Sequence, residues 1–173
     1  AIDHGKIIAS GPIQEADTLP GDRIDLNGAA VLPGLTDSHI HLQLYSEALQ
    51  SVQCETDTIA ECLRRVKEKV RMAKPGEWIV GTGWNQNVWT EGFGTAAMLD
   101  EVSPANPVYL TSKSIHSAWV NSKALEIAAI GNSTADPLNG VIDRDENGKA
   151  TGILFEEAME LVEDRIPPPT VDQ

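Results

Sequence analysis

The amino-acid sequence predicts a mixed α/β protein, and two patterns carry this prediction. An amphipathic helical pattern over residues 59–73 leads directly into an apolar strand pattern over residues 78–84. Further along, residues 141–144 and 149–151 are typical of two strands joined by a hairpin with Asn147-Gly148 at its tip. Helical and strand patterns therefore alternate along the chain.

The N-terminal part predicts short strands. A turn at His4-Gly5 is expected to lead into a strand that ends before Gly11. Residues 24–26 and 30–32 are expected to pair across Asn27-Gly28, because both turn residues tolerate a positive φ. After the break at Pro33-Gly34, residues 36–42 are expected to form a further strand.

The remainder of the chain predicts four helices and one further strand. The first helix begins at Thr58, with Glu61 completing a capping box, and ends at Lys74-Pro75-Gly76. A short helix is expected over 95–100, with Thr95 as its cap, and a strand over 108–111. The last two helices are expected over 123–130, capped by Asn121 or Ser122 and ended by Gly131, and over 155–165.

Composition restricts the classes of partner. The formal net charge of −13 argues against binding to nucleic acid or to an anionic membrane. The expected partner is a small-molecule substrate, and a homo-oligomer remains open. Cys54 and Cys62 do not form a CxxC motif, so we expect two free thiols and a cytoplasmic location.

Three ionisable residues recur at every second position in the expected strand 36–42. Because side chains alternate between the faces of a strand, Asp37, His39 and His41 would share one face. Two imidazoles at this spacing are natural ligands of a divalent metal such as zinc. An isolated His-x-His also arises by chance in purely structural strands, but three unpaired ionisable groups are costly to bury together.

The segment Leu32-Pro-Gly-Leu-Thr-Asp-Ser-His-Ile-His41 resembles the first-strand metal motif of the amidohydrolase superfamily. Downstream segments resemble the YtcJ-like branch, also called the amidohydrolase 3 group, and follow in the same order. These segments are 81–84, 99–102, 106–108, 116–125 and 152–156. One departure is Ile115, which stands where the resembled motif usually has glycine before His116.

The resemblance implies a composite fold. Residues 1–35 would contribute strands of a small β-sandwich, and residues 36–44 the first strand of a (β/α)₈ barrel with the metal motif. Residues 45–152 would form an inserted α+β subdomain, and residues 153–173 a helix leading back to the barrel. Because such a barrel alone needs at least about 200 residues, we expect the 173 residues to be an N-terminal piece of a longer enzyme.

The resemblance also implies a function, namely hydrolysis of an amide-type carbon–nitrogen bond by a metal-activated water. The site would contain one or two metals, usually zinc, and His39 and His41 would be ligands of the more buried one. Asp37 would orient a ligand histidine or stabilise the turn of the strand without binding the metal itself. The other ligands and the proton-shuttling aspartate are expected outside this chain, so the fragment itself should be inactive.

Four residues are candidates for the substrate pocket: His116, Trp84, Asn85 and Trp119. For the loop that begins at Trp84, simple packing is an equally good interpretation. Two other functions remain open. The piece from residue 45 to 148 could be an accessory or oligomerisation module, and Trp84, Trp89 and Trp119 could mark a carbohydrate- or peptide-binding domain.

Overall fold

The computed structural model describes residues 1–16, 18–32, 34–38 and 42–168, and the chain divides into two compact units. The first unit covers residues 1–40 and the second residues 41–173.

The first unit contains one small hairpin. Strands β1 (Ile2–Asp3) and β2 (Lys6–Ile7) pair antiparallel, and the turn between them places His4 and Gly5 at φ values of 46° and 74°. A four-residue helix, α1 (Ile13–Ala16), follows. Many large apolar side chains of this unit are exposed, with Ile24 at 82% and Leu35 at 96%, and every buried apolar residue among the described ones lies at Val52 or beyond.

The strands expected over 24–26 and 30–32 are wrong, although the turn between them is confirmed. Asn27 and Gly28 have φ values of 52° and 84°, and the Ala29 amide donates to the Leu26 carbonyl. The Asn27 amide donates to Asp25 Oδ1 at 2.8 Å, which also satisfies the turn locally. A turn forms from local bonds, whereas strands need a stable sheet and a buried face.

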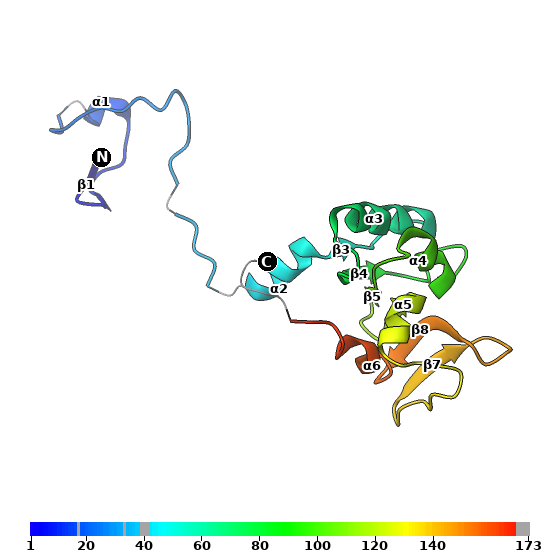
Figure 1. The fold of residues 1–173 in the computed structure, drawn as a ribbon. Coiled ribbons are helices and arrows are strands. Elements are labelled where there is room, and N and C mark those ends of the chain that lie inside the picture. Colours follow the sequence, from blue (N-terminus) through cyan, green and yellow to red (C-terminus); the bar gives the residue numbers. More distant parts are fainter. Residues whose placement is uncertain (17, 33, 39–41, 169–173) are drawn as a thin grey trace. The chain divides into compact units, whose positions relative to one another are not determined.

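The second unit is built on one six-stranded sheet, with the spatial order β3-β4-β5-β6-β8-β7 (Figure 1). Its strands are β3 (Val52–Gln53), β4 (Ile79–Trp84), β5 (Val108–Ser112), β6 (Ser117–Val120), β7 (Gly140–Arg144) and β8 (Ala150–Glu156). Strands β3, β4 and β5 are parallel, and the other neighbouring pairs are antiparallel. The mixed α/β class is therefore confirmed.

The helices of this unit are α2 (Leu42–Gln50), α3 (Ile59–Met72), α4 (Ala96–Val102), α5 (Ser122–Ile127) and α6 (Glu160–Glu163). The start of α3 is as expected, because Thr58 caps it by accepting from the Glu61 amide. Strand alternation divides the core between the two faces of the sheet. Val108 and Leu110 of β5 join a cluster with α3 side chains, and Tyr109 joins a second cluster with side chains of α5 and α6.

Three element boundaries correct the sequence prediction. Helix α5 ends at Ile127 rather than at 130, because Ala129 takes the left-handed conformation expected of Gly131, with φ 55°. Residues 155–156 belong to β8, since Phe155 pairs with both Ser117 and Val141, and the helix expected over 155–165 shrinks to α6. Strands β3 and β6 and helix α2 had no counterpart in the prediction.

Candidate functional site

The expected metal motif lies mostly beyond what can be described. His39 and His41 are outside the described residues, and Asp37 is exposed. The expected strand 36–42 is not formed in its described part, because residues 36–38 belong to no strand and Leu42 begins α2. A barrel strand is held by neighbouring parallel strands, and the described strand pairings include none with residues 34–38.

Trp84 and Trp119, expected in the substrate pocket, are both completely buried. The Trp84 indole donates to the Leu110 carbonyl at 2.7 Å, and the Trp119 indole donates to the Thr95 carbonyl at 2.9 Å. Trp89 lies between them in the sequence and stacks on Trp84 at a centroid distance of 6.0 Å. A side chain with no exposed surface cannot form a pocket wall in this conformation, so these indoles act as core residues here.

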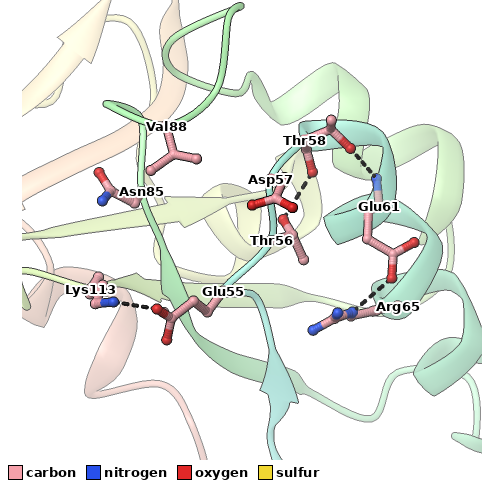
Figure 2. Close-up of a pocket in the computed structure, with 10 residues that line it drawn as sticks. Glu55, Thr56, Asp57, Thr58, Glu61, Arg65, Asn85, Val88 and Lys113 are labelled. Carbon is pink, nitrogen blue, oxygen red and sulfur yellow. Dashed lines mark hydrogen bonds and ion pairs between the residues drawn. The ribbon is translucent and has the colours of Figure 1, made fainter.

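Asn85, the third candidate, does line a cavity of about 450 Å³ (Figure 2). This cavity, which we call the polar cavity, opens where the parallel strands β3, β4 and β5 end. Its walls comprise Glu55, Thr56, Asp57, Thr58, Glu61, Arg65, Gly83, Asn85, Val88 and Lys113. The carboxyl ends of parallel strands are where open α/β sheets commonly bind ligands.

The charges around the polar cavity are largely paired. Lys113 forms an ion pair with Glu55, and Arg65 donates to Glu61 at 3.0 Å (Figure 2). Arg65 also donates to the Gln53 carbonyl at 2.8 Å. Hydrogen bonds from Arg64, and then from Arg65, lower the pKa of Glu61 to about 2. The carboxylate of Glu61 therefore stays ionised and is not available as a proton donor near neutral pH.

His116, the fourth candidate, forms an exposed pair with Glu156. Its Nδ1 lies 3.2 Å from both carboxylate oxygens of Glu156, and the Glu156 amide donates to the His116 carbonyl at 3.2 Å. The two side chains are 66% and 55% exposed. His116 immediately precedes β6 and Glu156 is the last residue of β8, so the pairing of these two strands holds the His116–Glu156 pair in position.

The backbone is strained at two positions of this site, at Ile115, which precedes His116, and at Glu156 itself. Ile115 has φ 63° and Glu156 has φ 50°, and a β-branched residue seldom adopts the left-handed region. Ile115 stands where the resembled motif has glycine, so this position takes a conformation natural to glycine. Strain of this kind costs about 1–3 kcal/mol per residue and concentrates at functional sites.

Glu156 is the candidate that sequence reasoning missed, because it was expected to lie in the helix over 155–165 rather than at the end of a strand. Its position 40 residues beyond His116 gives no local signal for the pair.

Within the described ranges, no group of three or more His, Cys, Asp or Glu side chains is arranged to hold a metal ion. In those same ranges no helix is both long enough and apolar enough to cross a membrane.

The described geometry is thus that of a mixed α/β unit with a polar cavity and a strained His–Glu pair. Comparison with known proteins identifies the family to which the chain belongs. The profile of the amidohydrolase family, Amidohydro_3, matches residues 22–173. The chain therefore belongs to the amidohydrolase family, as the motifs indicated.

Curated relatives agree with this assignment. The chain is 39% identical to Protein LONG AFTER FAR-RED 3 of Arabidopsis thaliana, over all of this chain and 30% of that protein. It is 38% identical to the putative amidohydrolase YtcJ of Bacillus subtilis, over 85% of this chain and 28% of that protein. It is 37% identical to an N-substituted formamide deformylase of Arthrobacter pascens, over 80% of this chain and 26% of that protein. The chain thus spans less than a third of the length of these relatives.

Solved structures give the same result. The chain resembles an uncharacterized metal-dependent hydrolase from Pyrococcus horikoshii OT3, with a TM-score of 0.57 and 31% identity, over 95% of this chain and 31% of that one. A second uncharacterized metal-dependent hydrolase, from Pyrococcus furiosus, has a TM-score of 0.53 and 29% identity, over 76% of this chain and 24% of that one.

Proposed function

We propose that these 173 residues are part of a longer metal-dependent hydrolase that cleaves an amide-type carbon–nitrogen bond of a small molecule. The observation that carries the proposal is the family match over residues 22–173, which contains Asp37, His39 and His41 in the order of the metal motif. The similarity to an N-substituted formamide deformylase supports a carbon–nitrogen bond as the target. The similarity to two metal-dependent hydrolases supports the need for a metal.

The chemistry of the donor set fits a divalent metal such as zinc. His39 and His41 supply two neutral imidazole nitrogens, a common ligand type for zinc, and Asp37 is of a type that often orients such ligands. When bound, such a metal would polarise a carbonyl and lower the pKa of water toward neutrality. In this proposal one or two metals are held by these two histidines together with ligands outside the chain.

In this proposal the chain contributes to three different parts of the longer protein. We assign residues 1–35 to a small β-sandwich and the segment before α2, which carries the metal motif, to the barrel. The inserted subdomain begins at α2 and includes all of β8, so it ends after Glu156 rather than at 152, and residues 153–156 are strand rather than part of the expected helix 153–173. The compact sheet of the second unit supports the last of these assignments. The free thiols Cys54 and Cys62 support a reducing, cytoplasmic compartment.

The experiment that tests the function is metal removal from the longer protein. Its activity on N-formyl and other N-substituted amides should fall to background after chelation and return when zinc is added back. A protein that kept full turnover after every metal had been removed, as verified by elemental analysis, would not be a metal-dependent hydrolase.

A first prediction concerns the 173-residue chain alone, which should not hydrolyse amides. A catalytic zinc site needs about three protein ligands and an open position, and His39 and His41 are the only two that the motif supplies. Product formation from N-formyl amides, followed with the purified chain in added zinc, checks this. Turnover that persisted in the chain carrying both His39→Ala and His41→Ala would reveal a contaminant, whereas turnover that these changes abolished would refute the prediction.

A second prediction concerns the His116–Glu156 pair, which we place in the substrate pocket. In the longer protein, His116→Ala should lower kcat/KM by about 10- to 100-fold, because a positioned polar contact with the substrate is lost. Its metal content should stay at the wild-type level. Kinetics and elemental analysis of the same preparation measure both quantities.

The control is His4→Ala, which removes another exposed histidine, one whose side chain is 92% accessible and pairs with its neighbour Asp3. This change should leave both quantities unaltered. If His116→Ala reduced the metal content instead, His116 would be a ligand and its assignment to the substrate pocket would be wrong.

A further inference from the structure

The two cysteines of the chain lie together in the core of the second unit. Cys54 follows β3, Cys62 lies in the first turn of α3, and neither side chain has exposed surface. Both side chains belong to the same buried apolar cluster, and the Cys54 thiol donates to the Val52 carbonyl at 3.5 Å. A disulfide between them requires the two sulfur atoms to approach to about 2.05 Å.

The segment between these cysteines forms much of the polar cavity. Five of its ten lining residues lie between Cys54 and Cys62, namely Glu55, Thr56, Asp57, Thr58 and Glu61. This cavity wall is held to other elements by the bond from the Trp89 indole to the Thr56 carbonyl at 2.9 Å and by the Lys113–Glu55 ion pair. A covalent link between Cys54 and Cys62 would therefore fix both ends of the wall.

The structure also offers a route by which buried thiols can react. Strand β3 has only two residues and lies at the edge of the sheet, so only β4 pairs with it. Its segment is otherwise tied by the Cys54 amide bond to the Thr82 carbonyl and by the Arg65 bond to the Gln53 carbonyl. Short edge segments with few bonds open locally far more often than the protein unfolds.

In the closed state the thiols should be inert. Contact with Cys62 and burial raise the pKa of the Cys54 thiol well above its ordinary value, so Cys54 stays protonated at neutral pH. Since the thiolate is the reactive form, reaction requires the local opening just described.

We propose that Cys54 and Cys62 form a redox-sensitive pair, which a small disulfide such as oxidised glutathione converts into an intramolecular disulfide that fixes the wall of the polar cavity. One cysteine thiolate attacks the small disulfide and releases one thiol, giving a mixed disulfide. The other cysteine then attacks the protein sulfur of that mixed disulfide and releases the second thiol. Two protein thiols are thus oxidised while one small disulfide is reduced to two thiols, and no other reactant is needed.

The test treats the folded 173-residue chain with oxidised glutathione, then alkylates it in denaturant and determines its mass. We expect a chain lighter by two hydrogen atoms, no alkylation, and a linked peptide containing Cys54 and Cys62. Dithiothreitol should reverse all three changes. The oxidised chain should melt roughly 5–10 °C higher, because a short loop is closed in the unfolded state.

Arginine variants test the route of opening. Arg65→Ala removes the bond to the Gln53 carbonyl and should speed oxidation about tenfold, the effect expected of one charge-assisted hydrogen bond that breaks on opening. Arg64→Ala is the matched control, since Arg64 pairs with Glu61 and Glu68 on the surface of the same helix. It should leave the rate close to that of the wild type.

Three outcomes would overturn the proposal. The first is full alkylation of both thiols after prolonged oxidation, and the second is a stable glutathione adduct or a disulfide-linked dimer in place of the intramolecular bond. The third is oxidation that occurs only at denaturant concentrations that unfold the chain, as followed by circular dichroism. Cys62→Ser supplies the mass standard, because it retains one thiol and can form no intramolecular bond.

Discussion

Replacing Asn121 with alanine is expected to lower the free energy of unfolding of the second unit by about 3–5 kcal/mol, among the largest effects of a single substitution. The Asn121 side chain is 1% exposed and makes four hydrogen bonds. Its oxygen accepts from the amides of Val108 and Ala124, both at 3.0 Å. Its nitrogen donates to the carbonyls of Ser103 at 3.1 Å and Asn106 at 2.9 Å. Alanine would leave four backbone groups without this partner in the interior.

Urea unfolding followed by circular dichroism measures this loss. Asn121→Asp is a sharper version of the test, because it keeps the accepting oxygen but turns a second oxygen toward two carbonyls, and should destabilise the unit at least as much. Asn139→Ala is the control, since Asn139 is exposed and its side chain donates to the exposed Glu157. Its effect should be within about 0.5 kcal/mol, and a similarly small loss for Asn121→Ala would show that the four bonds contribute little.

The segment from Trp119 to Leu125, which contains Asn121, is part of the core of the second unit. This segment resembles the branch-specific motif, and among its residues Trp119, Val120, Asn121, Ala124 and Leu125 are buried. Asn121 caps α5 and at the same time ties β5 to the turn after α4. In the described structure, the feature that marks the branch is therefore a packing and capping device.

Local sequence signals predicted an element correctly where the interactions that stabilise this element are also local. Helix α3 was predictable, because its cap, its apolar spacing and its stop signal all lie within residues 58–76. The β7–β8 hairpin was predictable for a similar reason, since Asp145 accepts from the amides of Asn147 and Lys149 and thereby shapes the turn. Strand β4 was found from its apolar start.

Strand existence elsewhere depends on distant partners, which a local pattern does not reveal. Strand β3 has two residues, and its pairing with Gly81 and Thr82 crosses the whole of α3. Strand β6 carries Ser117 and Ala118, which give no apolar alternation, and it exists because β5 and β8 flank it. Residues 24–26 show the reverse case, in which the pattern is present but these residues pair with neither of the described sheets.

The same limit applies to the candidate site. A tryptophan after a glycine-containing strand is consistent with either a pocket wall or a core residue, and only its surroundings decide. For Trp84 and Trp119 those surroundings are each other's rings, 6.5 Å apart, and the backbone carbonyls of Leu110 and Thr95. Glu156 became a candidate only through its left-handed backbone and its pairing with His116 across the sheet.

His39→Ala and His41→Ala are each expected to remove most of the bound metal from the longer protein and to reduce its activity to near background. Imidazoles two residues apart in the family's metal motif are the donors that this chain supplies, and the family match covers them. Loss of an orienting contact behind a ligand typically costs about 10- to 100-fold in metal affinity, and loss of a ligand itself should cost more. Elemental analysis after dialysis against a weak chelator, together with turnover of an N-formyl amide, measures both effects.

Two further variants serve as comparisons for the metal loss expected in His39→Ala and His41→Ala. Asp37→Asn should weaken the metal within that 10- to 100-fold range and so lie between the ligand variants and the wild type. His4→Ala should match the wild type, because His4 is an exposed turn residue of the β1–β2 hairpin. The order of metal loss, with both histidine variants beyond Asp37→Asn and His4→Ala unaffected, distinguishes ligation from a general loss of structure. Wild-type metal content and activity in both His39→Ala and His41→Ala would make the motif structural, and the proposed hydrolase function would lose the residues that support it.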